Sequence, residues 1–330
     1  MQKITREQLV EKAAALLGAG TVSAVLGWKK GEFDYDVTPA VFKTAEEVAE
    51  GFVWNDFCGA NFSKYLVAKA AKAEGKILVF LKPCDTYSFN QLLTEHRFDR
   101  EKVYAVGIPC EGMADIAKIK EICGEGISSV DCGEKIAVTT IYDDEPTLID
   151  AKDVLAERCV NCKSKKHVAY DELIIVNEMP EADSMKRFSK VAELEAMTAD
   201  ERFAFWKSEL SKCIRCNACR NVCPACTCTK CVFDNPESGV DAKANADKFE
   251  EKLFHIIRSF HVTGRCTDCG ECSRVCPQNI PLHLINRKYI KDINEFYGEY
   301  QAGADTESKA PLTSFTTSDI EPGSNLKEGK

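Results

Sequence analysis

The stretch CIRCNACRNVCPACTCTKC, residues 213–231, places seven cysteines in nineteen residues. Its first four cysteines follow the spacing C-x2-C-x2-C-x3-C, and Pro224 comes directly after the last of them. In iron–sulfur proteins this run binds 4Fe–4S clusters. The run occurs again at residues 266–276, with Pro277 directly after it. The two runs predict two cubic 4Fe–4S clusters in the second half of the chain.

Each run is expected to share its cysteines between the two clusters. Three thiolates two residues apart surround one face of a cube, and the fourth, directed onward by proline, reaches the other cube. The predicted ligands are Cys213, Cys216, Cys219 and Cys276 for the first cluster, and Cys266, Cys269, Cys272 and Cys223 for the second. Paired C-x2-C units also bind zinc. Two regular groups of four cysteines, each followed by proline, favour iron–sulfur clusters over zinc.

The segment between the two runs contains a predicted amphipathic helix. FEEKLFHIIRSFH (249–261) places apolar side chains along one stripe, namely Phe249, Leu253, Phe254, Ile257 and Phe260. With this long link, residues 195–290 resemble the α-helical ferredoxin domains of iron–sulfur subunits of the succinate-dehydrogenase and heterodisulfide-reductase types. The resemblance implies a helical domain that carries both clusters.

Composition excludes several classes of function. The chain has 330 residues and a net charge of −9, which argues against binding to nucleic acid. No apolar run is long enough to span a membrane, and the charged N-terminus is not a signal peptide, so we expect a cytoplasmic protein. Disulfides are rare in that compartment. The eighteen cysteines therefore indicate metal ligation, redox chemistry or catalysis.

The first half of the chain alternates between strand and helix patterns. Thr5 and Gln8 have capping-box spacing at the start of a helix predicted over 5–17. Strands are predicted in KILVFL (76–81), YAVGI (104–108) and KIAVTTIY (135–142), and helices after Asp85 and over 112–122. This alternation predicts an α/β domain with a mainly parallel sheet.

Three parts of the chain follow from these patterns. We expect an α/β domain over residues 1–185, an α-helical dicluster ferredoxin domain over 186–300, and an extended or disordered tail over 301–330. The tail is rich in Ser, Thr, Gly, Pro and charged residues, a composition that does not supply a core of its own.

Two turns in the α/β half share one layout of strand, proline, cysteine, acid and helix. Cys84 and Cys110 each follow a predicted strand, so in a parallel sheet both thiols lie at one edge. At a helix N-terminus a thiol pKa is lowered. Cys159 and Cys162 add a C-x2-C pair, which makes four ligands for a third 4Fe–4S cluster. The alternative is that Cys84 and Cys110 are buried apolar thiols.

The same residues carry a second resemblance. The order K-P-C-D (82–85), then G-x-P-C-x-G (107–112), then C-x2-C followed by D-E-L resembles the beta-subunit family of deazaflavin-coenzyme-reducing hydrogenases and dehydrogenases, over residues 10–180. The resemblance implies FAD, an iron–sulfur cluster and electron exchange with a nicotinamide-like coenzyme. No G-x-G-x-x-G fingerprint occurs, so no flavin-binding residues are assigned.

Three cysteines remain in the first cysteine-rich stretch. Cys226, Cys228 and Cys231 form a candidate fourth metal site, completed by one ligand from elsewhere in the fold. One alternative is a turn packed against the clusters, which excludes water and tunes their potentials. A reactive dithiol is the other.

These patterns predict an iron–sulfur electron-transfer subunit of a cytoplasmic, multi-subunit oxidoreductase in anaerobic metabolism. No proton-transfer constellation is evident, so no catalytic residue is assigned. Partners of the expected kind are a hydrogenase, a formate dehydrogenase, a heterodisulfide-reductase-like flavoprotein or a methylene-tetrahydrofolate reductase component. The alternatives are a flavin-dependent coenzyme reductase that acts by itself at the KPCD/IPCE edge, and a scaffold stabilised by zinc.

Overall fold

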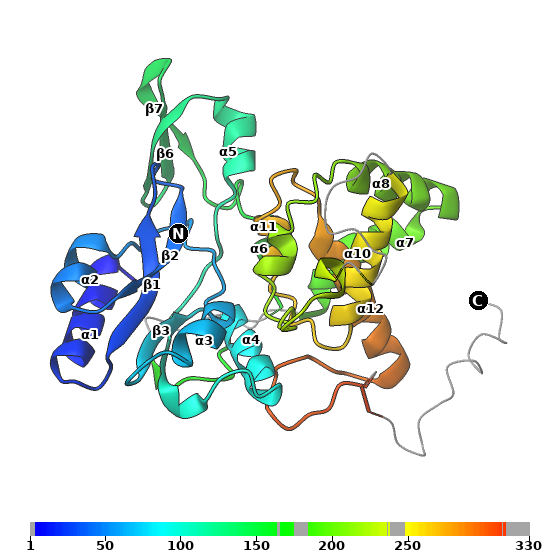
Figure 1. Cartoon of the computed structure of the whole chain (residues 1–330). Helices are drawn as coiled ribbons and strands as arrows, with labels where there is room; N and C mark the ends of the chain where they lie inside the picture. Colours follow the sequence, from blue (N-terminus) through cyan, green and yellow to red (C-terminus); the bar gives the residue numbers. More distant parts are fainter. Residues whose placement is uncertain are drawn as a thin grey trace.

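The computed structural model describes residues 4–163, 166–174, 184–235, 237, 248–311 and 313–314. Figure 1 shows a first half built around strands and a second half built from helices, with α6 and α11 lying between them. The expected class, an α/β domain followed by a helical region, is confirmed.

The larger sheet has five strands in the order β2-β1-β3-β4-β8, and every neighbouring pair except β1 and β2 is parallel. Its strands are β1 (Ala24–Lys30), β2 (Val37–Phe42), β3 (Ile77–Leu81), β4 (Val103–Gly107) and β8 (Glu172–Leu173). The strands predicted at 76–81 and 104–108 are parallel neighbours in it, with Leu81 opposite Gly107. The expected mainly parallel sheet is therefore confirmed.

Apolar sequence explains why this sheet forms the core of the first half. All five residues of β3 are buried, and Trp28 of β1 packs on Phe62 with ring centroids 4.2 Å apart. The accompanying helices are α1 (Arg6–Gly18), α2 (Ala45–Gly51), α3 (Ser63–Ala70) and α4 (Pro83–Thr94). The predicted capping box starts α1, where the Gln8 backbone N–H donates to the Thr5 hydroxyl at 3.3 Å.

The strand predicted at 135–142 belongs to a different sheet. Here β6 (Ile136–Thr140) pairs antiparallel with β5 (Ile127–Cys132) and β7 (Asp143–Ile149). These three strands project from the larger sheet beside α5 (Ile116–Cys123) (Figure 1). The prediction of a third parallel strand is wrong, because a turn of two residues joins β6 to β7 and a parallel pair needs a long crossover. Helix α5 also begins later than the predicted residue 112.

The second half is helical in its described parts. The short helix α6 (Glu157–Val160) comes before it. The helices of this half are α7 (Ser189–Ala196), α8 (Ala199–Ser211), α9 (Ala218–Asn221), α10 (Lys248–Val262), α11 (Glu271–Arg274) and α12 (Leu282–Tyr297). Among the described residues, the 3-10 turns of this half are η2 (Ser184–Phe188) and η3 (Val232–Asp234), and the α/β half contains η1 (Arg100–Lys102).

Helix α10 confirms the helix predicted over 249–261 but not its whole apolar stripe. Phe254 is 1% exposed, whereas Phe260 is 59% exposed. The buried face instead contains three polar side chains, those of His255, Arg258 and Ser259. The side chain of Phe249 lies outside the described part of the chain.

Residues 301–311 of the predicted tail pack against the α/β half. The Thr94 hydroxyl donates to the carbonyl oxygen of Thr306 at 3.4 Å. Gly303 has a φ of +76°, and a Cβ added there would collide with the carbonyl oxygen of Tyr87 on α4, so this close approach requires glycine. Residue 312 and residues 315–330 lie outside the described residues. The boundaries at 185/186 and 300/301 stay predictions.

A buried carboxylate joins the two halves. Glu271, the first residue of α11, is 1% exposed, and it accepts hydrogen bonds from Arg158 at 2.6 Å and from Arg274 at 2.7 Å and 2.9 Å. It also accepts from the backbone N–H of Asn61 at 3.2 Å. Burial raises the pKa of Glu271, but the two guanidinium groups outweigh burial and hold it at about 2. The cluster loop is thereby attached to the α/β half.

Neighbouring residues of the same loop make further contacts across the boundary. The Thr267 hydroxyl bonds to that of Ser88 on α4 at 2.7 Å, and the Lys163 ammonium donates to the Thr267 carbonyl. Within the helical half, Asp268 pairs with Arg287 at 2.9 Å, and both side chains are almost completely buried. Residues 267–271 are therefore fixed by charge and hydrogen bonds on both sides.

The Glu271→Gln variant tests this junction. It leaves the buried Arg158 without its counter-charge, which typically costs about 3 kcal/mol or more. We expect the thermal unfolding midpoint of the anaerobically purified protein to fall by several degrees. Glu193→Gln is the matched control, because Glu193 pairs with Lys190 on the exposed surface, and it should leave the midpoint within about one degree. Equal midpoints for the two variants would contradict the junction.

Candidate metal centres

Four thiols from both cysteine runs line one small pocket. Cys213, Cys216 and Cys219 come from the first run, and Cys276 comes from the end of the second. Phe254, His255 and Leu282 close the same pocket with apolar and aromatic surface. The structure thus brings together the four thiols that the sequence predicts as ligands of the first cluster.

The second predicted set is gathered in the same way. Burial raises the pKa values of Cys266, Cys269 and Cys272 to about 12, and neighbouring negative charges add to the rise, although Arg258 opposes it at Cys272. In each of the three, one of those charges is that of Cys223. Cys223, from the first run, therefore lies close to all three thiols of the second run. The fourth cysteine of each run, Cys223 or Cys276, therefore lies beside the first three cysteines of the other run.

The two runs have matching backbone conformations 53 residues apart. In the first, Arg215 and Asn217 on either side of the middle cysteine have φ of 52° and 61°. In the second, Asp268 and Gly270 occupy the equivalent positions with φ of 56° and 68°. A short helix follows each, α9 and α11. Left-handed residues at these places turn the chain around the position of the three thiols.

Polar atoms around the two sets fit clusters that accept hydrogen bonds. Each of His255, Arg258 and Ser259 on α10 is at most 1% exposed. Their side-chain nitrogen and oxygen atoms have no hydrogen-bond partner among the described residues. Buried donors without partners are costly, and hydrogen bonds to cluster sulfurs are a known determinant of cluster potential. These donors therefore suit an iron–sulfur group between the thiols.

The spacing of the possible ligands does not suit a site for a single metal ion. Within the described ranges, no three His, Cys, Asp or Glu side chains stand close enough together to hold one metal ion. Thiols around a cube of four irons stand farther apart than thiols around one ion.

The α/β half brings its own four cysteines together. Cys84, Cys110, Cys159 and Cys162 line one pocket, which also contains Cys269 from the second run. Cys84 follows β3 and Cys110 follows β4, and because these strands are parallel neighbours the two thiols lie at the same sheet edge. The structure therefore places the third predicted set directly beside the second.

Two details of that set differ from the sequence prediction. Cys84 is in the first turn of α4, but Cys110 lies in a loop, and α5 begins only at Ile116. The pKa of Cys84 is raised, not lowered, because burial and the charge of Asp85 outweigh the nearby Lys82. In the absence of metal, the helix N-terminus therefore does not lower the thiol pKa of Cys84 enough to favour the thiolate.

A buried ion pair supports this edge of the sheet. Lys82 and Asp85 are each 1% exposed, and the ammonium lies 2.7 Å from the carboxylate. Lys82 also donates to the carbonyl oxygen of Ala60 at 3.0 Å. The K-P-C-D sequence thus places a paired cation against the first cysteine of the set.

Cys226, Cys228 and Cys231 line a separate, open cavity of about 640 Å³. Asp234 and His261 line the same cavity and are candidates for the expected fourth ligand. Its cationic lining consists of Lys64, Arg220, Arg258 and Arg265. A hydrogen bond joins the thiols of Cys223 and Cys226, which lowers the pKa of Cys223 and raises that of Cys226. This cavity therefore adjoins the second predicted cluster.

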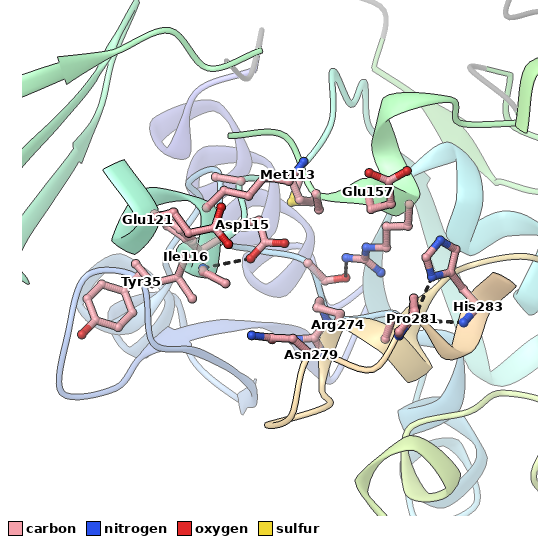
Figure 2. Close-up of a pocket in the computed structure, with 18 of the residues that line it drawn as sticks. Tyr35, Met113, Asp115, Ile116, Glu121, Glu157, Arg274, Asn279, Pro281 and His283 are labelled. Atoms are coloured by element: carbon pink, nitrogen blue, oxygen red, sulfur yellow. Dashed lines mark hydrogen bonds between the residues drawn. The ribbon is translucent and has the colours of Figure 1, made fainter. Parts of the chain in front are cut away.

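Another cavity, of about 360 Å³, lies between the α/β half and the helical half (Figure 2). The N-terminus of α5, with Asp115 and Ile116, forms one wall, and Arg274, Pro281 and His283 form the opposite wall. Met113 and Arg158 belong to this cavity and also to the pocket of the third cysteine set. A group bound here would be adjacent to that set.

Sequence reasoning missed Glu271, Asp268 and Arg258. Superimposing the two runs at their spacing of 53 residues would have drawn attention to two of them, because Ala218 and Arg215 stand at the equivalent positions. The signal for Arg258 is weaker. It is polar on the same face as Phe254, which the helical period marks as buried.

Comparisons with known proteins agree with this description. Residues 209–280 match the model of a 4Fe–4S dicluster domain. The chain is 26% identical over 360 residues to the F420-dependent formate dehydrogenase subunit beta of Methanocaldococcus jannaschii, with 90% of this chain and 91% of the relative covered. It is 24% identical to the F420-dependent formate dehydrogenase 1 subunit beta of Methanococcus maripaludis, with 90% of each covered.

Two further findings complete the comparison. A chain of the F420-reducing [NiFe] hydrogenase complex from Methanosarcina barkeri aligns with 63% of this chain and 89% of its own length, at 12% identity and a TM-score of 0.34, which is too low to argue from. Among the described residues, no helix has the length and apolar character needed to cross a bilayer.

The predicted resemblances and the prediction of two 4Fe–4S clusters are confirmed by these matches. The chain is an iron–sulfur electron-transfer subunit of the oxidoreductase type, with a 4Fe–4S dicluster domain at residues 209–280, and over nine tenths of its length it is similar to beta subunits of F420-dependent formate dehydrogenases.

Proposed function

We propose that the chain relays electrons through three adjacent 4Fe–4S clusters between a flavin and a partner redox enzyme. The observation that supports this proposal is that neighbouring cysteine sets contact the same residues. Cys269 of the second run lines the pocket of the α/β set. The charges of thiols from both ferredoxin sets act on the same guanidinium group, that of Arg258. Adjacent sets suit the transfer of electrons from one cluster to the next.

The proposed ligands are those predicted from the sequence. The first cluster takes Cys213, Cys216, Cys219 and Cys276, the second takes Cys266, Cys269, Cys272 and Cys223, and the third takes Cys84, Cys110, Cys159 and Cys162. A fourth metal site would use Cys226, Cys228 and Cys231 with Asp234 or His261. It would hold a cluster rather than a single ion, because no three of the described side chains of these types stand close enough together to hold one ion. The cationic side chains around that cavity favour an anionic metal–thiolate group.

The cavity at the N-terminus of α5 is the proposed place of a flavin. Its volume of about 360 Å³ is at the small end of ligand sites, which suits part of FAD, such as its ring system. Bound there, FAD would supply the step between two-electron and one-electron transfer. The chain's own contribution is to hold it against Met113 and Arg158, next to the third cysteine set.

The partner is proposed from the relatives. Those are beta subunits of F420-dependent formate dehydrogenases, so a formate-oxidising subunit is the partner that we favour, with a deazaflavin coenzyme at the flavin. Hydrogenase, heterodisulfide-reductase-like and methylene-tetrahydrofolate reductase components are the other partners considered. A cytoplasmic location is proposed because all eighteen cysteines are present as thiols rather than disulfides.

A second function is a coenzyme reductase that works without a partner. The open cavity beside the sheet edge of Cys84 and Cys110 favours it, since a substrate could reach a flavin there. The two functions differ in whether the isolated chain turns over.

Iron content tests the ligand assignment. The native chain should bind at least about twelve irons by the count of three cubes, with more where the fourth site is also occupied by iron. Cys216→Ser, Cys269→Ser and Cys84→Ser should each lose about four irons and remove one cluster signal from low-temperature EPR of the reduced protein. Cys123→Ser is the control, because Cys123 lies on α5 outside the three sets, and it should keep all of the iron.

Full iron retention in the first two variants would refute the ferredoxin ligands. Full retention in Cys84→Ser alone would refute the third cluster and leave the other two in place.

Flavin content tests the cavity. Ala117 lies in the first turn of α5 and lines the cavity, so Ala117→Asp adds a negative charge where an anionic cofactor would approach. We expect the flavin content to fall at least tenfold while the iron content stays unchanged. Ala199→Asp makes the same change in the first turn of α8 on the exposed surface and should keep the flavin. Similar flavin content in both variants would place the flavin elsewhere.

Turnover separates the two functions. The isolated chain should be reduced by a low-potential donor such as reduced methyl viologen, yet catalyse deazaflavin reduction by formate only after a formate-oxidising partner is added. Steady deazaflavin or nicotinamide turnover with an artificial donor and no partner would favour the reductase that acts by itself.

A further inference from the structure

Helix α10 carries an arginine into the space between the two ferredoxin sets. Arg258 is 1% exposed, and none of its three guanidinium nitrogens has a hydrogen-bond partner among the described residues. An arginine this deeply buried normally pairs with a carboxylate or another acceptor. The acceptor for Arg258 must therefore come from something other than the described side chains and backbone.

Thiols of both sets surround this guanidinium. The thiols whose charges act on Arg258 include Cys272, Cys219 and Cys223, and Arg258 also lines the cavity of Cys226, which adjoins the second set. Cys219 lines the first pocket, and Cys272 and Cys223 belong to the second set. One cation thus lies within electrostatic reach of both predicted clusters.

Three other buried cations near the cysteines differ from Arg258. Arg158 pairs with Glu271, Arg287 pairs with Asp268, and Lys82 pairs with Asp85. Each of these positive charges is offset by a carboxylate. Arg258 keeps its full charge for the thiols around it.

We propose that Arg258 is a positive charge shared by the two ferredoxin-type clusters, and that it raises the reduction potential of both. A 4Fe–4S cube with four thiolate ligands is an anion, and reduction by one electron makes it more negative by one charge. A fixed cation nearby stabilises the reduced cube more than the oxidised cube. The guanidinium N–H groups also supply donors to cluster or thiolate sulfur, which acts in the same direction.

The position of one cation between two clusters also affects electron transfer between them. A cation that served one cluster would separate the two potentials and trap the electron there. A cation between them raises both potentials together, so the electron can move in either direction. This proposal rests on the ligand assignment proposed above and adds a role for a residue that binds no iron.

The test is an EPR-monitored redox titration of the full-length protein. Arg258→Met removes the charge and the donors, and Arg258→Gln removes the charge but keeps an N–H donor. We expect both variants to keep their iron and to show lower midpoint potentials for both clusters. Arg258→Lys keeps the charge, so its two potentials should lie closer to the native values. Lys252→Met is the control, because Lys252 is on the same helix and its ammonium lies over the Phe203 ring.

The outcomes separate the possibilities. Unchanged potentials in Arg258→Met, a shift at one cluster alone, or an equal shift in Lys252→Met would overturn the shared charge. Loss of iron from both clusters in the two neutral variants, with retention in Arg258→Lys, would support it as an essential counter-charge, and loss in Arg258→Lys as well would overturn it. If the native protein itself lacks two cluster signals, the ligand assignment fails instead.

Discussion

The buried carboxylate of Glu271 keeps the second cysteine run against the α/β half. Its two arginine partners come from different parts of the chain, Arg158 beside the third cysteine set and Arg274 within α11. Because Glu271 lies between Cys269 and Cys272 in the sequence, this contact also fixes the cluster loop. The placement of Cys269 in the pocket of the α/β cysteines follows from it. A relay that crosses two domains needs such a fixed junction, since electron transfer depends on a constant separation.

The interior of the molecule has the opposite charge balance from the whole chain. The chain carries a net charge of −9. Its buried ionised side chains, within the described ranges, are the cations Lys82, Arg158, Lys163, Arg187, Arg215, Arg258 and Arg287 and the acids Asp56, Asp85, Asp268 and Glu271. An excess of buried cations is costly unless anions accompany them. Thiolate-bound clusters would supply those anions, so folding and cluster binding are expected to support each other.

The features that could be predicted from the sequence are those with local spacing. The cysteine runs at 213–223 and 266–276 and the twin turns at Cys84 and Cys110 carry their ligands in short motifs, and the structure gathers those thiols. The junction could not be predicted, because Arg158 and Glu271 are 113 residues apart. The pairing of the strand at 135–142 could not be predicted either, because its apolar pattern says nothing about its partner strand. The face of α10 was misjudged because a cluster makes buried polar residues favourable, which hydrophobic periodicity does not anticipate.

The close approach of Gly303 to Tyr87 affects the order in which parts of the chain pack together during synthesis. Tyr87 lies one turn after Cys84 on α4, in the part of the protein that is synthesised early. The segment that covers it, residues 301–311, is synthesised more than two hundred residues later. The α/β half therefore emerges first but is closed last. For the third cluster proposed above, that interval would allow iron and sulfide to be delivered to Cys84 before the end of the chain packs over α4.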